Sequence, residues 1–337
     1  RCDWSSDVCS SDLIYCRENL TSDKISRPSK VFKIEIKFTP VIDLLDRLYK
    51  VFTNSSYIDE WQSIKEEMPP LNYIYGPPGT GKTTTICNNI KKLLAEKTDA
   101  KILVLTPTNK AADVVCQKLV VENTDISVVR LSHPTDFELE EYSVYCDSID
   151  ADAMTHINVV ASTIHRLPYF DIQDAGLLFQ YQWDYVIFDE SSMIGLPYIT
   201  FALMSIFKTN TNVKFIIAGD PKQIPPVIDI TDDELENFDF QDENIYKMMK
   251  LESFKSEEQE IREIDTIKNL DIQYRSVPQI GQLFSELSYS GLLRHDRATN
   301  RIESKILPEK MRGLISSNVT FINIPLNEDN SIFNVKK

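Results

Sequence analysis

The stretch from Leu71 to Thr84 reads Leu71-Asn72-Tyr73-Ile74-Tyr75-Gly76-Pro77-Pro78-Gly79-Thr80-Gly81-Lys82-Thr83-Thr84 and joins an apolar run to a glycine-rich turn. From Gly76 onward it satisfies the pattern G-x-x-x-x-G-K-[ST], between a predicted strand and a predicted helix. Glycines allow backbone N–H groups to curl around a phosphate, and a helix N-terminus faces the anion. We expect Lys82 to reach the β- and γ-phosphates of a nucleotide and the Thr83 hydroxyl to ligate Mg²⁺. The predicted phosphate contacts are Gly76, Pro77, Pro78, Gly79, Thr80, Gly81, Lys82, Thr83 and Thr84.

A second apolar run, Tyr185-Val186-Ile187-Phe188, ends in the two carboxylates Asp189 and Glu190. After a phosphate-binding loop, this pattern predicts that Asp189 holds Mg²⁺ and that Glu190 orients or deprotonates an attacking water. Taken alone, the first motif could be a chance glycine turn and the second a solvated strand end. Together they predict a nucleotide-hydrolysing site.

Short apolar runs alternate with helical patterns from about Leu71 onward, which indicates a parallel sheet covered by helices. The candidate strands are residues 72–75, 102–106, 158–161, 185–188 and 214–218. The loops that follow such strands lie at the carboxyl edge of the sheet, where doubly wound sheets bind ligands. The predicted class is therefore α/β.

Four further motifs resemble those of superfamily 1 helicases. The stretch Gly219-Asp220-Pro221-Lys222-Gln223-Ile224-Pro225-Pro226 resembles motif III, and Leu103-Val104-Leu105-Thr106-Pro107-Thr108-Asn109-Lys110-Ala111-Ala112 resembles motif Ia. Similarly, Ala161-Ser162-Thr163-Ile164-His165-Arg166-Leu167 resembles motif Ic, and Gln273-Tyr274-Arg275 with Pro278 resembles motif IV. The resemblance extends from Leu71 to about Leu293. It implies a P-loop NTPase fold with a RecA-like sheet and the start of a second RecA-like lobe.

The resemblance also assigns roles to individual residues. It implies that Gln223 senses the γ-phosphate of ATP and that Arg275 is an arginine finger, beside Lys82, Asp189 and Glu190. It implies that Pro107, Thr108, Asn109, Ser162 and Thr163 contact the backbone of a single strand, which suits donors that do not read sequence. Ordinary turn and cap chemistry is the alternative for these five. Gln62 stands where an adenine contact often precedes the loop, although the spacing is loose.

The implied function is an ATP-dependent translocase or helicase core that uses Mg²⁺ and tracks along single-stranded DNA or RNA. Some motifs are similar to the group of the nonsense-mediated-decay helicase and senataxin and others to RecD, so the choice of nucleic acid stays open. Both groups belong to the 5′-to-3′ branch. The alternative function is a regulatory or effector NTPase switch without unwinding activity. Stimulation of ATP hydrolysis by single-stranded nucleic acid would distinguish the motor from the switch. A kinase-type enzyme explains neither Gln223 nor Arg275.

The predicted organisation has five parts. Residues 1–13 are expected to be a sequencing artefact, because the stretch from Asp3 to Leu13 is what an adapter encodes in one reading frame; a natural Ser/Asp-rich tail is the alternative. Residues 14–70 form a flanking segment, 71–228 the first lobe, 229–264 an acidic connector or insertion, and 265–337 part of a second lobe. Nothing after Arg275 resembles the two further motifs that the family places there. We therefore expect the chain to be cut short at both ends.

The 337-residue chain is acidic, with a formal net charge of −15. Removing the one Arg and three Asp of residues 1–13 changes this charge to −13. A uniformly basic nucleic-acid binder is thereby excluded, so phosphate contacts must be local. The cysteines form no C-x-x-C pair, which argues against a zinc site. With no signal peptide and no apolar run of about 20 residues, we expect an intracellular protein without a membrane partner, cytoplasmic or, in a eukaryote, nuclear. The sequence does not indicate protein partners.

Overall fold

The structure is a computed structural model, and it describes residues 48, 69–122, 126–131, 144–146, 151–169, 178, 181–226, 244–255 and 263–297. Gln62, residues 1–13 and residues 298–337 lie outside this set. In the described part, no helix is long and apolar enough to cross a membrane.

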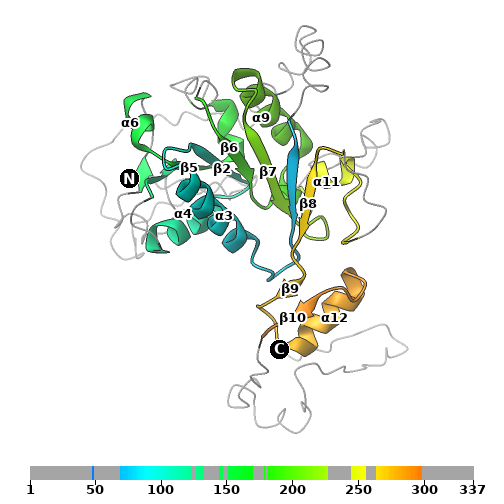
Figure 1. The fold of residues 1–337 in the computed structure, drawn as a ribbon. Coiled ribbons are helices and arrows are strands. Elements are labelled where there is room, and N and C mark those ends of the chain that lie inside the picture. Colours follow the sequence, from blue (N-terminus) through cyan, green and yellow to red (C-terminus); the bar gives the residue numbers. More distant parts are fainter. Residues whose placement is uncertain are drawn as a thin grey trace, which may run out of the picture. The chain divides into compact units, whose positions relative to one another are not determined.

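Eight strands form one parallel sheet in the order β4-β3-β5-β2-β6-β7-β1-β8 (Figure 1). Their bounds are β1 Leu71–Tyr75, β2 Ile102–Thr106, β3 Val128–Leu131, β4 Tyr145–Cys146, β5 Val159–Thr163, β6 Tyr185–Phe188, β7 Lys214–Gly219 and β8 Thr266–Asn269. All five predicted strands are confirmed, and the largest difference is at β5, which begins one residue later and ends two residues later than expected. The α/β class is confirmed as well.

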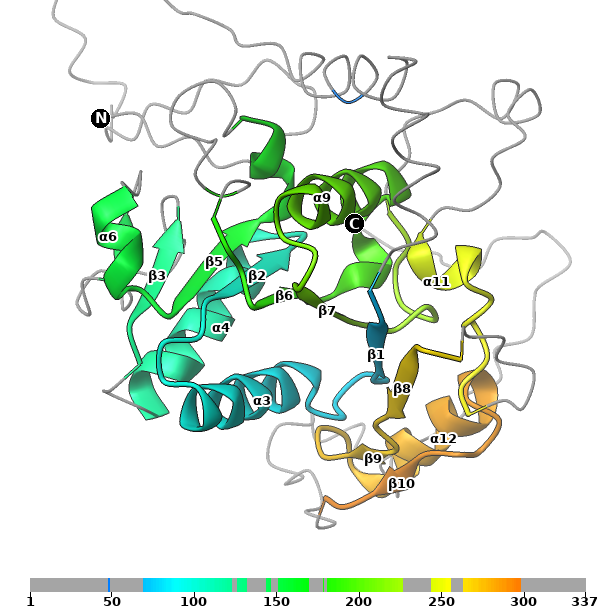
Figure 2. The ribbon, with the colours of Figure 1, turned by 45° about the horizontal axis from the view of Figure 1, so that its top comes forward.

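Helices connect the strands, because neighbouring parallel strands need crossover connections. The α-helices are α3 Lys82–Glu96, α4 Asn109–Glu122, α6 Ala151–His156, α9 Leu196–Thr209, α11 Ile245–Met248 and α12 Pro278–Ser288. Two 3₁₀ helices, η2 Ile164–Tyr169 and η3 Ser191–Met193, follow β5 and β6. Helices α3 and α4 cover one face of the sheet and α9 covers the other (Figure 2).

The central strands of the sheet are mostly apolar, as expected where helices cover both faces. In β2, Leu103 and Leu105 belong to the core on the α9 side, whereas Ile102 and Val104 belong to the core under α3 and α4. This division follows from the two-residue alternation of side chains along a strand. Two separate cores therefore fix the strand positions that carry the loops at the carboxyl edge.

A second, two-stranded sheet pairs β9 (Ile272–Gln273) with β10 (Arg294–His295), and α12 lies between them in sequence. Before it, β8 pairs with β1 in the large sheet, from Asn72↔Thr266 to Tyr75↔Asn269. Strand β8 thus completes the first sheet although its residues fall within the predicted 265–337 lobe. The limits of the lobes themselves stay a prediction.

Candidate functional site

The loop from Gly76 to Gly81 leaves β1 and turns into α3. Its left-handed positions are Gly79, with φ of 76°, and Gly81, with φ of 81°. A Cβ on Gly76 would lie 2.3 Å from Lys82 Cγ, so only glycine fits beside the lysine stem. The Thr80 hydroxyl donates to the Pro77 carbonyl at 2.7 Å, which closes the turn. The backbone is therefore preformed as a loop that ends at a helix N-terminus, as the sequence predicts.

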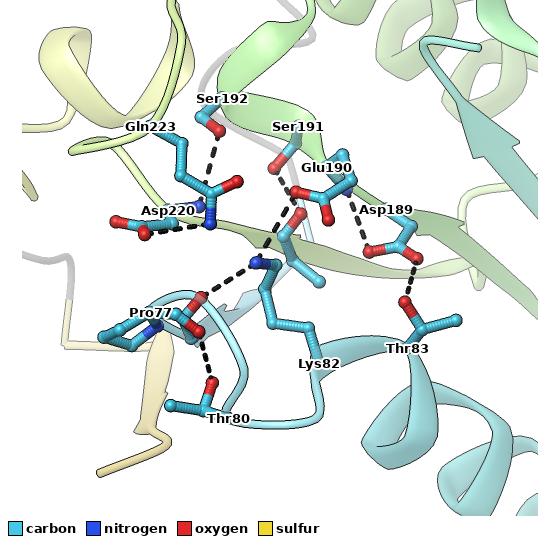
Figure 3. A network of polar contacts seen from close by, with 12 residues as sticks. Pro77, Thr80, Lys82, Thr83, Asp189, Glu190, Ser191, Ser192, Asp220 and Gln223 are labelled. Atoms are coloured by element: carbon cyan, nitrogen blue, oxygen red, sulfur yellow. Dashed lines mark hydrogen bonds and ion pairs between the residues drawn. The ribbon is translucent and has the colours of Figure 1, made fainter. Parts of the chain in front are cut away.

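Lys82 lies inside this loop and is almost fully buried. Its Nζ donates to the Gly76 carbonyl at 2.9 Å and lies 3.5 Å from Glu190 Oε2 (Figure 3). Glu190 Oε2 is itself buried and accepts no hydrogen bond among the residues described. An ammonium group with three donors therefore stands beside an acceptor whose hydrogen bonding is incomplete.

Thr83, in the first turn of α3, faces the end of β6. Its hydroxyl donates to Asp189 Oδ2 at 3.1 Å, and Asp189 Oδ1 accepts from the Glu190 backbone N–H at 2.9 Å. Burial, together with the nearby charge of Glu190, raises the pKa of Asp189 to about 6, although the charge of Lys82 opposes this rise. A buried carboxylate and a hydroxyl side by side offer the oxygen ligands that a hard cation prefers, and such a cation would stabilise the ionised carboxylate.

Glu190 adopts a left-handed backbone conformation, with φ of 51°. Such a conformation is uncommon for a residue with a side chain, and it is found where the surrounding structure imposes it. After Glu190 the chain turns into η3, where Ser191 and Ser192 are buried. The Ser191 hydroxyl donates to the Ala218 carbonyl at 2.8 Å, which ties the end of β6 to β7.

Ser191 and Ser192 were not predicted as site residues. A Cβ on Gly219 would lie 2.9 Å from both Ser191 Oγ and the Ser192 backbone nitrogen, so η3 packs directly on the glycine that ends β7. Small side chains following two carboxylates are the local signal for this close packing. The serines thus hold Glu190 and Asp220 in adjacent positions.

Asp220 follows β7 and is fully buried. Its Oδ2 accepts from Gln223 Nε2 at 3.0 Å, and its Oδ1 accepts from the Lys222 backbone N–H at 3.0 Å. Burial raises the pKa of Asp220, which these hydrogen bonds oppose. Gln223 is thereby placed in the same group of side chains as Lys82 and Glu190 (Figure 3).

Arg275 reaches this region from the segment that follows β9. A Cβ on Gly79 would lie 2.6 Å from Arg275 Cβ, and the Tyr274 backbone N–H donates to the Gly79 carbonyl at 2.9 Å. The motif that carries Arg275 therefore contacts the phosphate loop through its backbone. The Arg275 side chain is exposed.

Of the predicted residues of the nucleotide site, Thr84 is placed apart from this group. Thr84 is exposed, and its hydroxyl accepts from Lys118 Nζ on α4 at 2.5 Å. Gln62 lies outside the described residues. The contacts of these two side chains with a nucleotide stay predictions.

The residues predicted to contact single-stranded nucleic acid lie at the carboxyl ends of the neighbouring β-strands β2 and β5. Thr108 is exposed, and its side chain caps α4 by accepting from the Ala111 backbone N–H at 3.2 Å. Pro107, Asn109 and Thr163 are half-buried. Ser162, in contrast, is fully buried and its hydroxyl donates to the Thr163 carbonyl at 3.4 Å. Four of the five residues are thus accessible from the same edge of the sheet.

A buried arginine supports this edge and was not predicted. Arg130 on β3 is fully buried, and its Nε donates to Asp113 Oδ1 on α4 at 2.8 Å. Its Nη2 donates to Asn109 Oδ1 at 2.8 Å, and its Nη1 donates to the Leu131 carbonyl. An arginine inside the apolar run Val128-Val129-Arg130-Leu131 is the sequence signal for such an internal partner. It orients the first turn of α4.

Comparison with known proteins supports the sequence motifs. A family described as AAA domain matches residues 61–229. The RNA helicase Mov10l1 of Mus musculus is 32% identical over 171 residues, which cover 47% of this chain and 14% of that protein. The DNA replication ATP-dependent helicase/nuclease dna2 of Schizosaccharomyces pombe is 30% identical over 270 residues, which cover 77% of this chain and 17% of that protein.

Among solved structures, a crystal structure of the Pif1 helicase from Bacteroides aligns with 67% of this chain and 44% of that one, at 18% identity and a TM-score of 0.37. The chain thus spans about one sixth or less of the two curated relatives. The family match covers half of the chain and includes the phosphate loop, both carboxylates and Gln223. The resemblance to superfamily 1 helicases is confirmed, and the chain belongs to the AAA domain family, whose fold binds a nucleotide.

Proposed function

We propose that this chain is the motor core of a helicase, which binds ATP with Mg²⁺ and uses hydrolysis to move along single-stranded DNA or RNA. One observation carries the proposal. Lys82, Asp189, Glu190 and Gln223 come from three different strand ends and lie in one group of side chains (Figure 3), in which Glu190 Oε2 is buried and accepts no hydrogen bond from the described residues. The relatives bear helicase names, which favours a motor over a regulatory switch.

The residues present fit a magnesium ion. The Thr83 hydroxyl and the Asp189 carboxylate lie 3.1 Å apart, and both are the oxygen donors that Mg²⁺ prefers. When bound, the ion would neutralise charge on the phosphate oxygens. Asp189 has a raised pKa because its charge is buried, and a cation at this place would stabilise the ionised form.

Each of the remaining side chains has a distinct role in this proposal. Lys82 exchanges its contact with the Gly76 carbonyl for phosphate oxygens, since its Nζ has donors to spare. Glu190 accepts a proton from water or orients it, for which its Oε2 accepts no hydrogen bond from the residues that the structure describes. Gln223 faces the γ-phosphate, and Arg275 approaches it from the segment after β9.

The single-stranded nucleic acid would lie along the carboxyl ends of β2 and β5. Pro107, Thr108, Asn109 and Thr163 offer hydroxyl, amide and backbone groups there, which bind phosphates without reading base identity. In this arrangement the buried Ser162 hydroxyl positions Thr163 by donating to its carbonyl. Because the chain is acidic overall, this edge would bind through local contacts rather than through net charge.

The test measures the rate of ATP hydrolysis by the full-length protein under three conditions: without nucleic acid, with single-stranded RNA, and with single-stranded DNA of equal length. We expect one of the two strands to raise turnover severalfold and Glu190→Gln to abolish the rise. Binding of ATP without any stimulation by either strand would favour the switch. Comparison of the two strands also decides between RNA and DNA.

A further inference from the structure

A tyrosine outside the motifs joins the nucleotide site. Tyr289 directly follows α12 and is 4% exposed. Its hydroxyl donates to Asp220 Oδ2 at 2.7 Å, across 69 residues of sequence. The bond connects the α12 segment to the turn after β7, which carries Gln223.

The oxygen that Tyr289 contacts is the one that also holds Gln223. Asp220 Oδ2 accepts both Tyr289 OH at 2.7 Å and Gln223 Nε2 at 3.0 Å. Asp220 is fully buried, so its carboxylate depends on these donors in place of water. The orientation of the Gln223 amide is therefore set through Asp220.

Aromatic packing holds the tyrosine ring in place. The ring of Tyr289 lies edge-on to Phe254 at 5.9 Å and to Phe284 at 6.0 Å between centroids. Phe254 in turn packs against Tyr75, the residue before the phosphate loop, at 4.9 Å. Such edge-to-face contacts restrict a ring and so fix the position of its hydroxyl.

We propose that Tyr289 is a positioning residue which, through Asp220, keeps Gln223 oriented toward the γ-phosphate. The proposal rests on the proposed function, in which Gln223 contacts that phosphate. It makes the sensing of ATP depend on where the α12 segment lies. Burial and the charge of Asp220 raise the pKa of Tyr289, so its hydroxyl stays a donor at neutral pH.

The test compares Tyr289→Phe with Tyr75→Phe in the full-length protein, by measuring the affinities for ATP and ADP. Both variants remove one hydroxyl from the same aromatic cluster, but Tyr75 OH donates to the Glu252 carbonyl, not to Asp220. Since ADP lacks the γ-phosphate, Tyr289→Phe should leave ADP affinity unchanged and reduce the ATP-to-ADP affinity ratio about tenfold, as expected for losing a hydrogen bond to a charged group. Tyr75→Phe should leave the ratio unchanged.

Gln223→Ala provides the reference. It should reduce the ratio as well, and adding Tyr289→Phe to it should have little further effect, because both changes act through one amide. An unchanged ratio in Tyr289→Phe, or a full additional loss in the double variant, would overturn the proposal. An unchanged ratio in Gln223→Ala would overturn the γ-phosphate assignment itself, and this inference with it.

Discussion

Replacing Asp113 with leucine would leave the Arg130 guanidinium buried without its carboxylate partner. Arg130 has no exposed surface and Asp113 only 1%. Removing one partner of a buried ion pair costs about 3–5 kcal/mol of unfolding free energy. Arg130 would keep two neutral acceptors, on Asn109 and Leu131, so we expect a loss near the lower end, about 3 kcal/mol.

Urea denaturation measures this loss. With a slope of about 2 kcal/mol per molar urea, the midpoint should fall by about 1.5 M. Lys97→Ala is the control, because Lys97 pairs with Asp184 at 2.7 Å but is exposed. Breaking an exposed pair should cost about 1 kcal/mol or less.

A double variant separates charge burial from other effects. Asp113→Leu with Arg130→Met removes both charges, and replacing a buried pair by apolar residues is often nearly neutral. Most of the stability should therefore return. Affinity for single-stranded nucleic acid should fall in the double variant, because Arg130→Met removes the donor that orients Asn109. A double variant as unstable as Asp113→Leu would refute the argument from an uncompensated charge.

Three other outcomes follow from the site. Lys82→Ala should abolish productive ATP binding, whereas Glu190→Gln should keep binding and block hydrolysis, because only the first removes charge that compensates phosphate; near-normal turnover in Glu190→Gln would remove that residue from its role. Affinity for homopolymer single strands should depend little on the base and fall as salt rises, and strong discrimination between scrambled oligonucleotides would count against the backbone contacts. Asp189→Asn should raise stability in urea at pH 7, because a folded-state pKa raised to about 6 means that ionisation destabilises the fold as pH rises from about 4 to about 6; the gain should disappear below pH 4, and an equal gain at both pH values would contradict this cause.

The elements nearest the nucleotide could be predicted from the sequence because their signals are local. Apolar runs that end in glycine or carboxylates identify β1, β6 and β7 together with the loops that follow them. Strand β8 carries no such signal: Thr266-Ile267-Lys268-Asn269 is largely polar because it lies at the edge of the sheet. Its position depends on pairing with β1, which is nearly 200 residues away in sequence, and the Leu71 N–H adds a bond to Asp265 Oδ1, just before β8, at 2.8 Å.

The site shows the same division. The sequence motifs predict which side chains come together, but they do not reveal what orients those side chains. Arg130 and Tyr289 each act on a motif residue from a distant element, and neither belongs to one of the helicase-like motifs. Their roles arise from tertiary contacts of a buried charge and a buried hydroxyl, which local spacing does not encode.

The pairing of β8 with β1 also limits how far Arg275 can travel. The Leu270 backbone N–H donates to the Tyr75 carbonyl at 2.8 Å, so the chain is anchored beside the phosphate loop until that point. From Leu270, the five residues to Arg275 span at most about 18 Å when fully extended. In the role proposed for it, Arg275 would be tethered beside the phosphate loop by this short segment, which would give it a high effective concentration at the phosphates.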